Sequence, residues 1–488
     1  MTRRRPAARV EQQPTTPPRR TIARYGGQGT MPRRRIAARL GTGLALVLAV
    51  AACGSGGGSA GTAAPTSTTT APAAECVQNE QGTGCLPLAP ESQRVDRTTP
   101  VFSRPTEITN PLFPVAAVAQ SLQLGTADGE PFRAEVTLLP ATKPITWNGR
   151  QVPTRIHQYV AYSNGRILEV ALDWYAQADD GSVWYFGEDV FNYEDGVVAD
   201  TDGTWLAGKH GPPGMIMPAD PSPGQVYRPE NIPELVFEQV TVKSTGQTVP
   251  GPRGPVDGAV VVSELHLDGA REAKTFAPGY GEFSAGGGGD LEAVALAVPV
   301  DAAGGPPPAE LTTLTAGARS SFDAAGTGRW ADASTRVDAM AAAWNRVKDG
   351  VPELPARQTT ATLAALAKAV DARDPARARQ AALRAEQAAL DLELRHRPAA
   401  EVDLDRMDLW ARQLLVDAAA EDAGGVAGDV ATLQVIWDRA GHTAAPAAGD
   451  RVTAALKSLH GAADEEKLEA AATGVLDLRN ALTVWTEP

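Results

Sequence analysis

Three histidines in the last third of the chain have side chains that can bind a metal ion. Together with Glu401, Asp403 or Asp405, the side chains of His396, His442 and His460 would form a donor set of imidazole and carboxylate for copper, zinc or iron. Each histidine lies at the predicted C-terminal end of a helix, where donor side chains favour the unpaired carbonyls. No second histidine lies three or four positions from any of them, the spacing that would place two ligands on one face of a helix. We therefore predict no metal and no cofactor. Metal handling by the helical region stays an alternative.

Acidic residues are concentrated between 173 and 202. Asp173 and Glu188 are the pair that an envelope hydrolase would use, because paired carboxylates in glycoside hydrolysis have no fixed spacing. Most of the other acids lie beside glycine in tight turns, where Asp is favoured, and no EF-hand spacing occurs. We interpret the acids as turn residues and a solvated strand face.

Nucleophile motifs and glycine patterns for phosphate binding are missing from the regions predicted to fold. We therefore predict no catalytic residues and favour a role other than catalysis. Four aromatic side chains are candidates for a ligand site, with a place in the hydrophobic core as the alternative; they are Trp174, Trp184, Tyr185 and Trp205.

Residues 31–53 have the order of a secretory signal. Arginines at 33–35 and 39 precede an apolar run over 40–52, which is too short to span a bilayer, and the run ends Val-Ala-Ala-Cys at Cys53. This segment resembles the lipobox of bacterial lipoproteins. The resemblance implies a signal peptide over 31–52, a diacylglyceryl group on Cys53 and a place on the outer face of the cytoplasmic membrane or in the cell envelope. Translation is expected to begin at Met31.

The composition agrees with export and argues against nucleic acid as a partner. The chain has a net charge of −13, and its first 52 residues hold eleven Arg and one Glu, so the remainder is more acidic than the whole. Phosphate binding needs clustered basic residues instead. The abundance of Ala, Gly, Pro, Arg and Asp indicates a high-GC bacterial genome of actinobacterial character.

Residues 53–99 are predicted to form a flexible tether that contains a small cysteine loop. The Gly, Ser, Thr, Ala and Pro residues after Cys53 cannot form a core. Cys76 and Cys85 bracket ten residues, and two cysteines left in an oxidising compartment favour a disulfide.

Residues 100–284 are predicted to form an antiparallel β meander, closed as a barrel or open as a half-barrel. Asn148-Gly149, Asn164-Gly165, Asp180-Gly181 and Asp195-Gly196 are hairpin dipeptides at nearly even spacing. The segments at 108–114, 173–189, 211–227 and 275–283 resemble uncharacterised secreted bacterial β proteins that share WYAQ and VWYFGE sequences. The resemblance implies an exported β domain and no particular activity.

A Gly- and Pro-rich linker is predicted at 285–308, followed by an antiparallel bundle of helices at 309–488. Apolar residues there recur with a three-four spacing, and Asp374-Pro375 is a helix start signal. The predicted class is thus α+β with two folded regions. The sequence favours a lipid-anchored envelope protein that binds a small ligand or docks to a protein partner, with metal handling and hydrolysis as alternatives.

Overall fold

The structure is a computed structural model that describes residues 75–287 and 290–483. The predicted signal peptide and the lipidation site at Cys53 lie outside the described residues. Within the described residues, none of the helices has the length and apolar character needed to cross a membrane. The predicted disulfide between Cys76 and Cys85 is present.

The first folded region is one 14-stranded antiparallel sheet. Its strands are β1 (Gln120–Ala127), β2 (Glu130–Trp147), β3 (Arg150–Ser163), β4 (Arg166–Gln177), β5 (Val183–Glu194), β6 (Val197–Asp200), β7 (Trp205–Leu206), β8 (Gly214–Met217), β9 (Val226–Ile232), β10 (Val236–Gly251), β11 (Gly254–His266), β12 (Arg271–Ala277), β13 (Gly281–Gly287) and β14 (Asp290–Val298).

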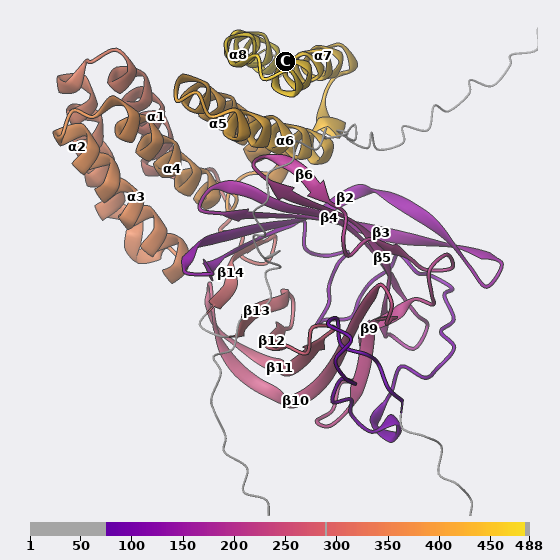
Figure 1. The fold of residues 1–488 in the computed structure, drawn as a ribbon. Coiled ribbons are helices and arrows are strands. Elements are labelled where there is room, and N and C mark those ends of the chain that lie inside the picture. Colours follow the sequence, from indigo (N-terminus) through magenta and orange to yellow (C-terminus); the bar gives the residue numbers. More distant parts are fainter. Residues whose placement is uncertain (1–74, 288–289, 484–488) are drawn as a thin grey trace, which may run out of the picture.

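The sheet is strongly curved but open, which confirms the half-barrel alternative. Strand order runs β6-β5-β4-β3-β2-β1-β14-β13-β12-β11-β10-β9, with β7 and β8 paired to β5. Figure 1 shows β10–β13 curving round to face the strands β2–β5 across an interior. The hairpins form where the dipeptides predict them: Asn148-Gly149 and Asn164-Gly165 both have positive φ at each residue, as a type I′ turn requires.

The predicted linker at 285–308 is partly wrong, because β14 lies within it. Residues Asp290–Val298 pair with β1 on one side and β13 on the other. The apolar run Val294 to Val298 is buried and forms a strand. Gly286 and Gly287 are the last residues of β13 rather than part of a link between domains.

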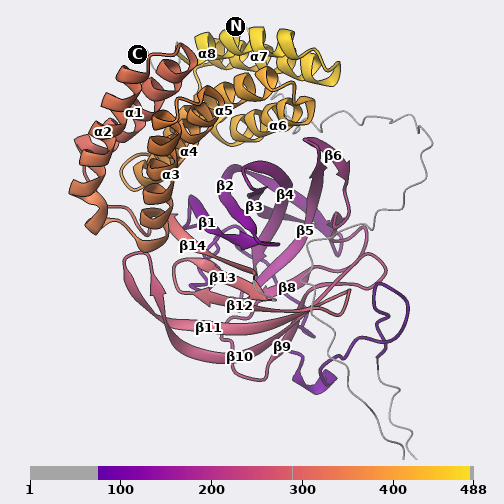
Figure 2. The same ribbon diagram turned by 60° about the vertical axis from the view of Figure 1, so that its left-hand side comes forward.

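Eight helices follow in the described residues. They are α1 (Ala309–Gly326), α2 (Trp330–Val347), α3 (Glu353–Asp371), α4 (Pro375–Glu393), α5 (Ala399–Ala419), α6 (Ala423–Ala440), α7 (Pro446–Asp464) and α8 (Leu468–Thr483). Asp374 caps α4 by accepting the N–H of Arg377, as its sequence predicts. One apolar core joins α1–α5 and a second joins α5–α8. Figure 2 shows these helices arching over the sheet.

A buried network of ion pairs joins the helices to the sheet. Arg439 of α6 contacts Glu135 of β2 at 2.5 Å and Asp403 of α5 at 2.7 Å. Arg406 bridges Asp403 and Asp391 at 2.8 and 2.9 Å, and Arg133 of β2 joins Asp391 at 2.6 Å. Three guanidinium groups therefore meet three carboxylates, which offsets the desolvation of each charge.

Candidate functional site

The interior of the half-barrel holds a cavity of about 290 Å³. It lies between strands β1–β5 on one side and β12–β14 on the other, and the segment around Phe113 and Val115 closes part of it. The lining mixes carboxyl groups with aromatic rings. The carboxyl, tyrosine and lysine side chains of the lining are Tyr159, Glu169, Asp173, Tyr175, Glu188, Glu272, Lys274, Tyr280, Glu282 and Glu292.

Strand alternation places the carboxyl groups inside. On β4, Glu169, Asp173 and Tyr175 line the cavity, whereas Val170 packs with Val435 of α6 on the opposite face. Because successive side chains of a strand point to opposite faces, the helices enclose the apolar face and leave the acidic face for the interior. Our interpretation of the acids as a solvated strand face is therefore wrong for Asp173 and Glu188.

Asp173 and Glu188 are directly opposite each other on β4 and β5. The Tyr185 hydroxyl donates to Asp173 at 2.7 Å, and Trp205 Nε1 donates to Glu230 at 3.0 Å. Burial raises the pKa of Asp173 to about 7. Burial, together with the charges of Glu230 and Asp173, raises the pKa of Glu188 well above its ordinary value.

Lys274 is the only Lys or Arg among the cavity-lining residues. Its ammonium group lies 2.9 Å from Glu264 and 3.5 Å from Glu282. Burial opposes its charge, but the surrounding carboxylates outweigh that effect and raise the pKa of Lys274 well above its ordinary value. On β14, burial and then Glu282 raise the pKa of Glu292 to about 8. Several carboxyl groups therefore share the ammonium group of Lys274 as their counterion.

The site thus carries more potential negative charge than its own cation can balance. Carboxyl groups in this position either retain protons or gain a cationic partner. His157 adds little positive charge, because burial lowers the pKa of His157 to about 4. The arrangement is suited to attract a small cation.

All four aromatic candidates are buried, and two of them also form hydrogen bonds to acidic residues. Trp174 and Trp184 are buried in the apolar core, with the Lys143 ammonium 3.1 Å from the Trp174 ring centre and Trp184 donating to Ser182. Tyr185 and Trp205 are also buried, but their polar atoms donate hydrogen bonds to Asp173 and Glu230. They hold acidic residues in place and do not line the cavity.

The histidines of the helical region are not brought together into a metal site. The His442 Nδ1–H donates to the carbonyl of Arg439 at the end of α6, and His460 lies within α7. His396 follows α4. Among the residues that the structure describes, the one group of at least three potential metal ligands contains none of them.

Sequence reasoning missed Glu169, Lys274, Glu282 and Glu292 as site residues. The available signal was the alternation of acidic and aromatic residues with apolar ones, which was visible on β4. It could not show that the acidic face is enclosed, because that depends on what packs against the opposite face.

The chain matches no protein-family model and none of the curated protein sequences with which it was compared.

Proposed function

We propose that this chain is an exported, lipid-anchored envelope protein that binds a small cationic ligand inside its half-barrel without transforming it. The observation that carries the proposal is the cavity of about 290 Å³, lined by several carboxyl groups and one ammonium group. A ligand that carries positive charge would supply the missing countercharge. Lipid anchoring rests on the lipobox sequence that ends at Cys53.

The lining also favours an organic cation over a bare ion. Tyr159, Tyr175 and Tyr280 share the cavity with Glu169 and Asp173. Aromatic faces attract ammonium groups, and the attraction is larger in sites that exclude water. The volume lies at the lower end of the range for small-molecule sites, so the expected ligand is a compact amine or quaternary ammonium compound.

The described chain begins beside β9, because Glu75 forms an ion pair with the buried Arg228 of that strand at 2.8 Å. If Cys53 carries the lipid, the chain that comes from the anchor joins the half-barrel at this strand.

Hydrolysis remains a second candidate because of one observation. Asp173 and Glu188 are cross-strand neighbours with raised pKa values, and such pairs act as acid and base in glycosidases. Turnover of cell-wall glycans that is lost in Glu188→Gln would support this alternative over ligand capture.

Replacing Cys53 by Ala is expected to release the protein from membranes or to stop its processing. Without the Cys53 thiol, the thioether to the lipid cannot form. The lipid is the one membrane contact that we propose for the protein. Membrane fractionation with mass spectrometry of the N-terminus checks this. Unchanged membrane association, with no lipid on the wild-type chain, would contradict lipid anchoring.

The double variant Asp173→Asn, Glu188→Gln is expected to bind small amines at least tenfold more weakly than the wild type. Amide groups mimic neutral carboxyl groups in shape, so the fold should persist, but they cannot ionise to attract a cation. Isothermal titration calorimetry with putrescine, choline and ethanolamine measures the effect, and circular dichroism verifies folding.

Asp189→Asn provides the matched control for the amine titrations. Asp189 follows Glu188 on the same strand, but its side chain is 44% exposed and lies 3.7 Å from Lys143. Affinity should not change in this variant. Lack of binding to any of the three amines by the wild type would argue against an organic cation and direct the search to protein partners.

Affinity in the wild type should also rise with pH from about 5.5 to 8.5. Asp173 titrates near pH 7, and a proton on that carboxyl competes with the ligand below this pH, by up to about tenfold per pH unit for each proton displaced. Choline keeps its charge at every pH, so its titration isolates the ionisation of the protein.

A further inference from the structure

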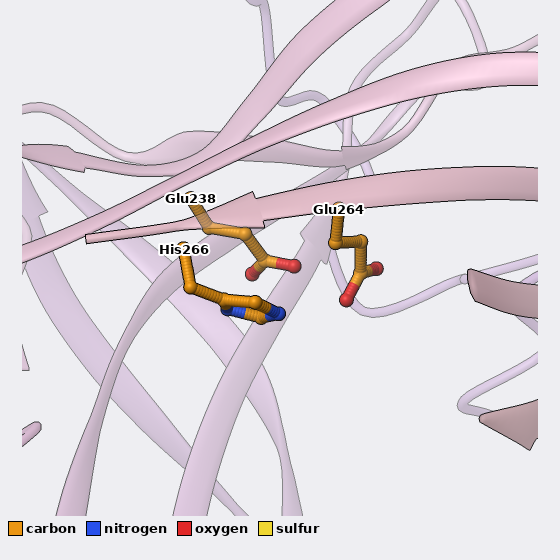
Figure 3. A group of neighbouring side chains, drawn as sticks. All are labelled: Glu238, Glu264 and His266. Carbon is orange, nitrogen blue, oxygen red and sulfur yellow. The ribbon is translucent and has the colours of Figure 1, made fainter. Parts of the chain in front are cut away.

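Beside the cavity, three potential metal ligands converge on neighbouring strands. Glu238 of β10 is directly opposite His266 of β11, and Glu264 precedes His266 by two residues. Residues at this spacing share one face of a strand. One ligand atom from each side chain lies within 4.8 Å of the others. Figure 3 shows the three side chains projecting from the strands toward one another.

The strands that carry this group are held from the opposite face. Phe237 and Leu265 alternate with the three ligands along the strands and pack against Val77 and Leu86 beside the Cys76–Cys85 disulfide. The N–H of Glu80 also donates to the carbonyl of Leu267 at 2.8 Å. The disulfide loop therefore supports the backbone from which the ligands project, which limits the reorganisation needed to bind an ion.

A buried hydroxyl without a partner lies on the same face of the sheet as this group. Tyr227 of β9 is 1% exposed, and its hydroxyl has no hydrogen-bond partner among the described residues. Tyr227 pairs with Val240, which pairs in turn with Glu264, so the three lie in one row on one face of the sheet. A buried hydroxyl without a partner is costly. A carboxylate that turns to bind a metal ion, or a water molecule bound to that ion, would give the Tyr227 hydroxyl a hydrogen-bond partner.

Access and charge also suit a metal ion. The His266 side chain is 36% exposed, which leaves a path from solvent, whereas the Glu264 side chain is 3% exposed. Lys274 neutralises Glu264 in part, but it also lies 3.5 Å from Glu282 and can keep that partner when a metal ion takes Glu264. Glu272 lies 3.8 Å from His266 Nε2 and can orient the imidazole or serve as a fourth ligand.

We propose that Glu238, Glu264 and His266 form a binding site for one divalent transition-metal ion of the Zn²⁺ or Mn²⁺ type. Two carboxylates and one imidazole select such ions over soft Cu⁺. Bound at about 2.1 Å, the ligand atoms would need to close to about 3–3.5 Å from one another, a small side-chain movement. The inference does not depend on the amine site, because none of the three proposed ligands lines that cavity.

Metal titration of the full chain tests the site. The protein, with its disulfide intact, is stripped with a chelator and titrated with Zn²⁺ and with Mn²⁺, and bound metal is measured by elemental analysis and by competition with a chromophoric chelator. We expect one ion per chain. His266→Ala should weaken binding at least tenfold, and Glu238→Gln provides a second variant if the first folds poorly.

Two controls make the outcome decisive. Glu234→Gln removes an exposed carboxyl from the neighbouring β9–β10 turn and should leave metal affinity unchanged, as should Asp173→Asn in the cavity. The proposal is overturned if the wild type takes up no stoichiometric metal, or if uptake is unaffected by both His266→Ala and Glu238→Gln. Loss of uptake in His442→Ala instead would place the metal in the helical region and would also overturn it.

Discussion

Replacing Arg439 by Met is expected to lower the free energy of unfolding by about 3–5 kcal/mol. The Arg439 side chain is fully buried and pairs with both Glu135 and Asp403. Met fills a similar volume but carries no charge, so the variant leaves these two buried carboxylates to share Arg133 and Arg406. Urea denaturation, followed by tryptophan fluorescence and by helical circular dichroism, measures the loss.

The fluorescence and circular dichroism transitions should both move to lower urea concentration, because Arg439 links α6 to β2. Arg329→Ala is the control: this arginine pairs with Asp332 at 3.1 Å with both side chains more than half exposed, and exposed pairs of this kind contribute at most about 1 kcal/mol. If Arg439→Met changes stability no more than Arg329→Ala does, the network is not what holds the helices on the sheet.

Replacing Trp205 by Ala is expected to destabilise the protein by about 3–5 kcal/mol. Trp205 is 0% exposed, its ring lies edge-on to Tyr185 with centroids 5.4 Å apart, and its Nε1 donates to Glu230. The variant would leave a cavity and remove a hydrogen bond to a buried carboxyl. Thermal and urea denaturation measure the effect.

Trp205→Phe separates the cost of the cavity from the cost of the lost hydrogen bond to Glu230. Phe retains most of the apolar contact but has no N–H to give Glu230, so its cost should be smaller than that of Ala. If Trp205→Ala instead remains as stable as the wild type while amine binding disappears, Trp205 contacts the ligand directly, and its assignment to the core is wrong.

Local sequence determined the elements of this protein. Asn-Gly pairs fix hairpins at 148–149 and 164–165, because both residues must adopt positive φ there. Asp374 and Pro375 fix the start of α4, since the cap and the missing N–H of proline suit the first turn. Cys76 and Cys85 determine the disulfide loop through their short separation. Each of these signals acts over a few residues.

The role of each face of the sheet was decided only by tertiary structure. The alternation on β4 separates Asp173 from Trp174 in the sequence alone, but a strand does not encode which face becomes enclosed. Helix α6 covers the face of Val170, so the acidic face turns inward toward Lys274, which is about a hundred positions away in the chain. The same holds for Glu238 and His266, because cross-strand register, and not spacing along the chain, brings them together.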